Sequence, residues 1–298
     1  MLGARLVAVA ATAFLIGCTP ALAPKASSAE NAQPAPAAAT TLAASNGALA
    51  RESGASLDEL VDVEGLRLHL RCLGKGEPLV VFEAGLGLDA STWHLVQPAV
   101  AKVTRACAYD RAGRGSSGPA PFPHDQRRMA EELHALLTKS GERGPYLLVG
   151  HSMGAANVRW LLNEHPKEVA GMVLLEPATE DWPKKVLARV PVEAQPEFWQ
   201  NLLAWEGIER EAFIAGYEGL RAFGAALGSR PLFILTAEKP ENELPLRLEM
   251  HDPLEHLSAN VRHTVVKDSA HNIQLEAPAS VIESVRAVID AARTQSRL

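Results

Sequence analysis

The sequence has fewer basic than acidic residues and lacks any Lys/Arg run long enough to form a basic stripe. Its 298 residues include 29 Lys and Arg against 35 Asp and Glu, which gives a formal net charge of −6 at pH 7. Proteins that bind nucleic acid usually carry a basic patch or stripe. We therefore expect no nucleic-acid partner.

Cysteine is also scarce, since the chain has only Cys18, Cys72 and Cys107. The last two are far apart in the sequence and no paired His or Cys accompanies them, which argues against a metal site. Each lies in an apolar, strand-like run. An oxidising compartment would allow a disulfide between them, and buried free thiols are an equally open alternative.

No long apolar run near the N-terminus could serve as a permanent membrane span. The run Leu6–Gly17 follows Arg5 and ends at Cys18; it is too short to cross a bilayer but suits a signal peptide. Leu15–Cys18 resembles a bacterial lipobox, in which the cysteine becomes the lipidated first residue. We expect an envelope protein anchored by lipid at Cys18. Because residue 19 is Thr and not Asp, the resemblance to such lipoproteins implies the outer membrane, if the envelope has one. An ordinary secretory signal is the alternative.

The composition divides the chain into three parts. Residues 1–18 form the predicted signal, and residues 19–56 are rich in Ala, Pro, Ser and Thr, as expected for a flexible tether. Residues 57–298 are enough for one large α/β domain. The anchored protein would therefore hold a water-soluble body near the membrane.

Apolar strand-like runs alternate with helix-like segments through the domain, which predicts an α/β fold with a mostly parallel sheet and helices on both faces. The predicted strands are Leu66–Cys72, Leu79–Glu83, Arg105–Asp110, Tyr146–Gly150, Gly171–Glu176, Leu232–Thr236 and Val261–Val266. The predicted helices are 91–102, 125–140, 153–164, 241–257 and 277–293.

The stretch 177–228 breaks this alternation. It has helical periodicity without a convincing strand and contains Trp182, Trp199 and Trp205. We interpret it as a helical cap over the strand ends, with a pair of ordinary packing helices as the alternative.

The motif Gly150-His151-Ser152-Met153-Gly154 lies between an apolar run and a helix-like run. This strand–turn–helix context is the one that a nucleophile elbow of the form G-x-S-x-G requires. The turn is too tight for side chains at its flanking glycines. Ser152 is therefore the candidate nucleophile, and the side chain of His151 should point away from it.

A serine hydroxyl needs a base to remove its proton, and His271 is the best-placed histidine. It follows the last predicted strand and precedes the final helix. The acid that orients it is harder to choose. Glu176, at the end of an apolar strand, is preferred; Glu238 is the alternative acid, and Glu241 or Asp268 also remain open.

The oxyanion formed during acyl transfer needs two preorganised N–H donors. The backbone N–H of Met153 is one candidate because the elbow fixes its direction. The loop Glu83–Gly87 contains two glycines that allow close approach of its backbone, and the N–H of Leu86 is the second candidate. Asp110, Arg111 and Arg114 are interpreted as a structural loop whose charges pair with one another rather than as an anion pocket.

Three segments together resemble the α/β-hydrolase superfamily, in its AB hydrolase-1 branch: Phe82–Gly87, Tyr109–Ser116 and the elbow Gly150–Gly154. The resemblance covers about residues 60–295. It implies an eight-stranded sheet, a cap after the sixth strand and no metal or organic cofactor. Two departures are visible. The usual acid position after the seventh strand holds no Asp, and Ala155 replaces a frequent second glycine.

With Ser rather than Asp at the elbow, these residues predict cleavage of carboxylic esters through an acyl-enzyme. The aromatic cap predicts a small-molecule ester with an apolar portion. An acyltransferase or amidase with the same triad is the alternative, and a non-catalytic binding protein on a hydrolase scaffold is a further one. The oligomeric state does not follow from the sequence.

Overall fold

The computed structural model describes residues 56–120, 124–204, 210–223 and 227–298. The predicted signal peptide, Cys18 and all but the last residue of the tether lie outside these ranges, so their placement stays a prediction. Within the described ranges, no helix combines the length and the apolar character needed to cross a membrane.

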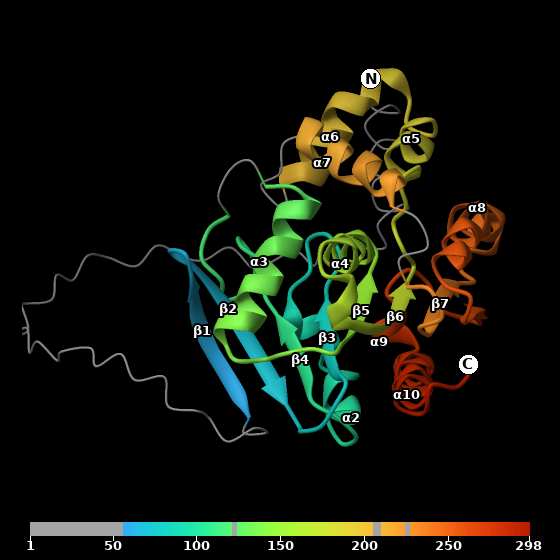
Figure 1. Cartoon of the computed structure of the whole chain (residues 1–298). Coiled ribbons are helices and arrows are strands. Elements are labelled where there is room, and N and C mark those ends of the chain that lie inside the picture. The colour runs from blue at the N-terminus through green and yellow to red at the C-terminus, as the bar shows by residue number, and fades with distance from the viewer. Residues whose placement is uncertain (1–55, 121–123, 205–209, 224–226) are drawn as a thin grey trace, which may run out of the picture.

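The described strands form one eight-stranded sheet in the order β1-β2-β4-β3-β5-β6-β7-β8 (Figure 1). Strand β2 runs antiparallel to both β1 and β4, and every other neighbouring pair is parallel. The mostly parallel α/β sheet expected from the sequence is confirmed. The strands are β1 (Leu57–Val63), β2 (Leu66–Leu73), β3 (Leu79–Glu83), β4 (Ala106–Tyr109), β5 (Tyr146–His151), β6 (Val169–Leu175), β7 (Leu232–Ala237) and β8 (Val261–Val266).

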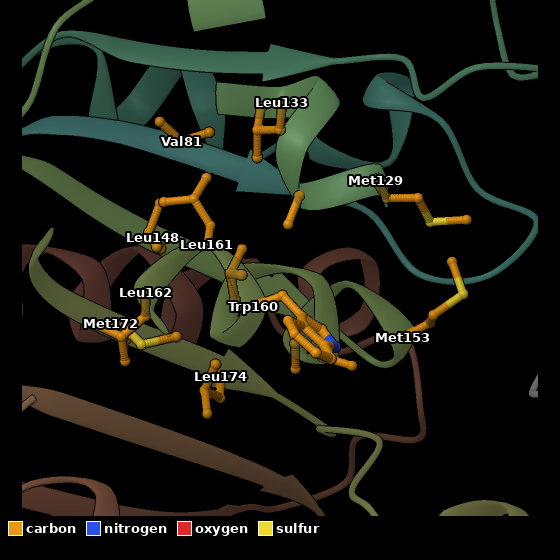
Figure 2. Packing of buried hydrophobic residues seen from close by; sticks show 14 of the residues in the cluster. Val81, Met129, Leu133, Leu148, Met153, Trp160, Leu161, Leu162, Met172 and Leu174 are labelled. Carbon is orange, nitrogen blue, oxygen red and sulfur yellow. The ribbon is translucent and has the colours of Figure 1, made fainter. Parts of the chain in front are cut away.

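Along the central strands, alternate side chains pack into two separate hydrophobic cores, one on each face of the sheet. Along β3, Val81 belongs to one core and Val80 and Phe82 to the other. Figure 2 shows the first core, where Val81 and Leu148 lie beneath the helices that carry Leu133 and Leu161. Burial on both faces explains why these strands have almost continuous apolar sequences.

Helices cover both faces of the sheet. Helices α3 and α4 line the first core, whereas α2, α9 and α10 line the second. Asp125 caps α3, since its side chain accepts a hydrogen bond from the N–H of Arg128, and Gly141 follows the helix end with φ 77°. The helices of the two faces are α2 (Gln97–Val100), α3 (Gln126–Lys139), α4 (Met153–Glu164), α9 (Ile273–Glu276) and α10 (Pro278–Thr294).

Two predicted helices are shorter and more broken than expected. The segment 91–102 is a 3₁₀ turn, Ala90–Trp93, followed by α2, and 241–257 contains α8 (Leu244–His251) between two 3₁₀ turns. Proline stands at the start of α2, of α8 and of the 3₁₀ turn after α8. Each proline lacks the N–H that would continue a preceding helix, so a new turn begins there.

The connection between β6 and β7 contains α5 (Trp182–Leu187), α6 (Gln195–Ala204) and α7 (Arg210–Gly219). Figure 1 shows these helices beyond the ends of β5 and β6, on the side to which the strand arrows point. Phe213 packs against the rings of Trp199 and Tyr217, with centroids 5.9 and 5.0 Å away. These three aromatic residues thus lie in the interior of a small helical layer over the strand ends.

Strands β2 and β4 are also joined covalently. Cys72 and Cys107 are direct partners in the antiparallel pairing and form a disulfide across a sequence separation of 35 residues. Both residues are fully buried. Of the two alternatives that the sequence left open, the structure has the disulfide.

Candidate active site

Ser152 lies on a strained turn between β5 and α4. Its backbone has φ 53° and ψ −120°, a conformation that residues with a side chain rarely adopt. A Cβ on Gly150 would stand 2.7 Å from the Cα of Ala155, and one on Gly154 would stand 2.5 Å from the oxygen of Ala84. Only glycine fits at either position, so the strand–turn–helix geometry expected from the motif is present.

The turn places Ser152 at the N-terminus of α4, whose first residue is Met153. The first N–H groups of a helix have no partner within the helix, and they carry its positive dipole end. The N–H of Met153 is therefore available, by position, to a developing negative charge near Ser152.

Glu176 and His271 meet although they lie on separate loops. Glu176 follows β6, His271 lies between β8 and α9, and the Glu176 Oε2 is 3.3 Å from the His271 Nδ1. Glu176 also has a positive φ, 44°, so both it and Ser152 occupy strained positions just after adjacent parallel strands. The other carboxylate oxygen, Oε1, accepts a 2.6 Å hydrogen bond from the N–H of Ala237 at the end of β7.

The contacts of Glu176 favour its ionised form and determine which nitrogen of His271 carries a hydrogen. Burial opposes ionisation of Glu176, but the hydrogen bond from His271 and the charges of His251 and Arg247 outweigh it and lower the pKa of the carboxyl group. The ionised carboxylate only accepts hydrogen bonds, so the His271 Nδ1 is the donor. When the ring is neutral, its Nε2 keeps a lone pair that can take a proton.

The other acids considered from the sequence have other partners. Glu238 accepts a hydrogen bond from the N–H of Asp268, and Asp268 pairs with the Lys239 ammonium at 2.8 Å. Glu241 lies exposed in the 3₁₀ turn before α8. The structure thus brings Glu176, and not these three residues, to His271.

The loop after β3 approaches the nucleophile closely. A Cβ on Gly85 would lie 3.3 Å from the Cβ of Ser152. The carbonyl oxygen of Gly85 accepts a 2.7 Å hydrogen bond from Nη2 of Arg111. The Gly85–Leu86 peptide is trans, and C=O and N–H point in opposite directions across a trans peptide. The Arg111 contact therefore directs the N–H of Leu86 away from the guanidinium.

Arg111 is held by a buried carboxylate. Its Nη1 lies 2.8 Å from Glu83 Oε1, and the same nitrogen donates to the carbonyl oxygen of Ala84 at 2.7 Å. Glu83 also accepts hydrogen bonds from Tyr109 and Asn157. Burial raises the pKa of Glu83, and the charge of Arg111 opposes this rise. The guanidinium thus links a fully buried acid to the backbone of the loop beside Ser152.

Asp110 has partners outside the segment 110–114. It accepts hydrogen bonds from the N–H groups of Ala90 and Ser116 and contacts the Nδ1 of His69. These partners lie on neighbouring loops and strands because the chain turns sharply after β4. The interpretation of this loop as structural agrees with these contacts.

His151 was expected to point away from Ser152, and its side chain contacts the His271 loop. Its Nε2 lies 2.9 Å from the carbonyl oxygen of His271, so this nitrogen carries the hydrogen and donates. Burial lowers the pKa of His151 to about 3, which keeps the ring neutral. No local pattern predicts this role, because the partner lies 120 residues away.

Two of the three clusters of His, Cys and acidic residues that could hold a metal in the described part of the chain are weak candidates. Cys72 and Cys107 are engaged in the disulfide. The rings of His134 and His165, near Glu168, are stacked 3.5 Å apart with an interplanar angle of 10°. Two parallel rings, one above the other, cannot both direct an in-plane lone pair at one ion.

Comparison with known proteins agrees with the fold. The family model described as "alpha/beta hydrolase fold" matches residues 78–212, which include the elbow and the loop after β3. The chain has the α/β-hydrolase fold.

Among the curated relatives of this chain, YqjL of Bacillus subtilis (strain 168) is 27% identical over 226 residues, which are 74% of this chain and 88% of YqjL. "Putative carbamate hydrolase RutD" of Klebsiella pneumoniae (strain 342) is 30% identical over 182 residues, 60% of this chain and 59% of RutD. Three further relatives are matched over only 25%, 37% and 32% of their own lengths.

Among solved structures, a thermophilic esterase from Thermogutta terrifontis superposes with a TM-score of 0.56. The alignment covers 80% of this chain and 99% of the esterase, at 19% sequence identity. At this identity the likeness supports the fold alone.

The segment after β7 lacks the Asp that the resemblance led us to expect. Strand β7 ends at Ala237, whose N–H binds Glu176, and the loop that follows carries Pro240 where an Asp was expected. Glu176 reaches His271 from the neighbouring strand β6 instead. The two loops are adjacent at the same edge of the sheet, so the carboxylate can arrive from either one.

Proposed function

We propose that this chain is a serine hydrolase that cleaves carboxylic esters through an acyl-enzyme, with Ser152 as nucleophile, His271 as base and Glu176 as acid. The contact between Glu176 and His271 carries the proposal. It orients an imidazole beside an elbow that holds a serine in the strained conformation of an exposed nucleophile.

In the first half of the reaction, the His271 Nε2 takes the proton of the Ser152 hydroxyl as Oγ bonds to the ester carbonyl carbon. The carbonyl oxygen becomes an oxyanion, which the N–H groups of Met153 and Leu86 stabilise. The imidazolium then gives its proton to the leaving alcohol as the ester C–O bond breaks. Glu176 stabilises the imidazolium while it exists.

In the second half, water replaces the alcohol. His271 takes a proton from the water as its oxygen attacks the acyl carbon, and returns that proton to Ser152 Oγ as the acyl group leaves as a carboxylic acid. The aromatic interior of α5–α7 over the strand ends supports an ester with an apolar portion.

The test is hydrolysis of p-nitrophenyl esters from acetate to long acyl chains by the full chain in detergent micelles. Ser152→Ala should abolish turnover, and Glu176→Gln should lower kcat by about 10²- to 10⁴-fold, because the amide cannot stabilise the imidazolium. Glu238→Gln is the matched control, since Glu238 accepts a hydrogen bond from the backbone N–H of Asp268, and it should retain wild-type turnover. Activity that survives in Ser152→Ala would contradict the proposal.

We further propose that the chain is anchored to the cell envelope by lipid on Cys18, and that residues 19–56 tether the hydrolase to the membrane. The lipobox-like Leu15–Cys18 supports this placement. When the full chain is expressed in a Gram-negative host, it should fractionate with the outer membrane, and Cys18→Ala should remove it from that fraction. Equal fractionation of both forms would contradict lipid anchoring and favour simple secretion or another attachment.

A further inference from the structure

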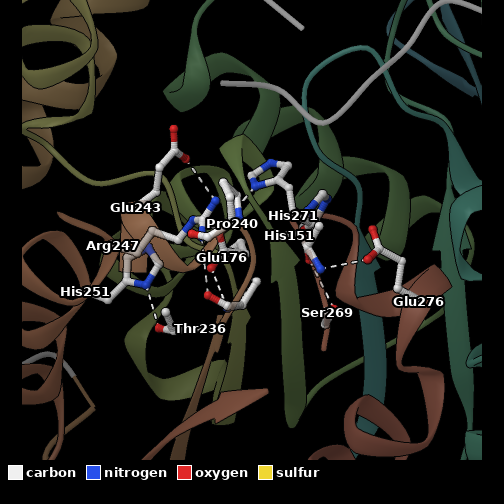
Figure 3. A network of polar contacts seen from close by, with 12 residues as sticks. His151, Glu176, Thr236, Pro240, Glu243, Arg247, His251, Ser269, His271 and Glu276 are labelled. Atoms are coloured by element: carbon white, nitrogen blue, oxygen red, sulfur yellow. Dashed lines mark hydrogen bonds and ion pairs between the residues drawn. The ribbon is translucent and has the colours of Figure 1, made fainter. Parts of the chain in front are cut away.

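The carboxylate of Glu176 has a second cationic neighbour besides His271. The Nε of Arg247, on α8, lies 3.2 Å from Glu176 Oε2, the same oxygen that contacts the His271 Nδ1 at 3.3 Å. Figure 3 shows Glu176 between the two side chains. The Arg247 and Glu176 side chains are 9% and 4% exposed, so solvent screens this pair only weakly.

Arg247 is in turn paired with another acid. Its Nη2 lies 3.0 Å from Glu243 Oε2, and this carboxylate is also largely buried. Its Nη1 lies 3.5 Å from the carbonyl oxygen of Ala237 and 3.4 Å from that of Pro240, which are long contacts. The guanidinium is therefore fixed between two carboxylates, and charges alternate along the row Glu243, Arg247, Glu176, His271.

This row affects how readily His271 accepts a proton. A nearby negative charge favours the imidazolium and a nearby positive charge disfavours it. Arg247 offsets part of the negative charge of Glu176 and competes with His271 for one oxygen. Glu243 acts in the opposite direction because it offsets the charge of Arg247.

We infer that Arg247 and Glu243 are positioning residues that set the pH range in which His271 is neutral and able to act as a base. The inference rests on the proposed function of His271. Arg247 disfavours the imidazolium and so extends this range to lower pH. Glu243 offsets the charge of Arg247 and so reduces this effect. Neither side chain needs to touch the substrate, because both act through the carboxylate of Glu176.

Other titratable groups near His271 contribute less to this balance. Burial lowers the pKa of His251 to about 4 and that of His151 to about 3, so both rings are neutral above these values. His251 shares the hydroxyl of Thr236 with His263, which faces Glu255 and Asp252. Two further acids bind backbone near His271: Glu276 accepts a hydrogen bond from the N–H of Ala270, and Glu238 accepts one from the N–H of Asp268. The other charged groups are the exposed Lys239–Asp268 pair and Arg111, which lies beyond His151.

The test compares Arg247→Met and Glu243→Gln with wild type in the full chain. The first readout is the pH profile of kcat/KM for p-nitrophenyl butyrate. Arg247→Met should move the acidic limb to higher pH by roughly one unit, because the nearby positive charge that disfavours the imidazolium is lost. Glu243→Gln should move the limb in the opposite direction, by less. Glu249→Gln is the matched control, because Glu249 lies on the same helix but is 66% exposed and pairs with Lys185; it should leave the profile unchanged.

The second readout does not need turnover. The NMR titration of the His271 ring, assigned with His271→Gln, should show the same two opposite shifts. If wild type hydrolyses no ester but the ring titrations shift as expected, the proposed function fails and the electrostatic inference stands. If esters are hydrolysed but the ring midpoint is equal in all variants, or both variants shift it in the same direction, the inference is overturned. Glu243→Gln retains every other contact of Arg247, which keeps the test open should Arg247→Met fail to fold.

Discussion

Replacement of Arg111 by methionine should damage both the stability and the chemistry of this protein, for two separable reasons. Arg111 is 3% exposed, and its guanidinium contacts Glu83, Ala84 and Gly85 at 2.7–2.8 Å. Methionine fills much of the same space but offers no donors. The substitution therefore leaves a buried carboxylate without its cation and two loop carbonyls without this partner.

The magnitudes follow from these contacts. Removing one partner of a buried ion pair, while the other stays buried and charged, lowers the free energy of unfolding by about 3–5 kcal/mol. Loss of one correctly aimed oxyanion donor costs about 10²- to 10³-fold in kcat. Because the oxyanion exists only in the transition state, kcat and kcat/KM should fall by similar factors in Arg111→Met while KM changes little.

Urea unfolding and ester kinetics of Arg111→Met and of the double variant Arg111→Met/Glu83→Gln separate the two effects. The double variant removes the buried charge, so it should regain much of the lost free energy of unfolding. It does not restore the contact to Gly85, so kcat should stay low. If kcat recovers together with stability, Arg111 acts only as a counter-ion of Glu83, and the argument for its control of the Leu86 N–H is refuted.

Three further predictions concern the rest of the molecule. Reduction of the Cys72–Cys107 disulfide should lower the free energy of unfolding by about 4 kcal/mol, the loop-closure value for its 35-residue separation, as measured by urea unfolding with and without dithiothreitol; an unchanged midpoint would contradict this. Burial in the folded state lowers the pKa of His251 to about 4. The unfolded chain therefore binds more protons than the folded chain between about pH 6.5 and 4. The free energy of unfolding should accordingly fall by up to about 3 kcal/mol as the pH is lowered across this window. His251→Asn should flatten that slope in unfolding titrations, and an equally steep slope would exclude His251 as its source. Glu176→Asp should lower kcat about 100-fold, because the shorter side chain cannot keep its contacts with both neighbouring loops; near-wild-type kcat would contradict the geometry described.

The nucleophile elbow and the general fold could be predicted because their signals are local. A tight turn that excludes a Cβ on both sides of Ser152 leaves a fixed pattern of glycines in the sequence. Strands buried on both faces have continuous apolar runs. The choice of Glu176 used a local feature as well, a carboxylate at the end of an apolar strand, and the structure places that carboxylate against His271.

The supporting contacts could not be predicted because their partners are distant in the sequence. Arg111 and Glu83 are 28 residues apart. Arg247 lies on α8, which the sequence pattern showed only as part of a longer helix, and its partner Glu176 ends a different strand. Such contacts depend on the order of the strands in the sheet and on the conformations of the loops. A short sequence motif predicts neither of them.

The central claim, that Ser152 is a nucleophile activated by its neighbours, is tested most directly by labelling the full chain with a fluorophosphonate. Intact-protein mass spectrometry should show a single adduct, peptide mapping should place it on Ser152, and ester hydrolysis should disappear in step with labelling. Ser152→Ala should remain unlabelled. Failure of the folded wild-type protein to react, or an adduct at another residue, would contradict the account.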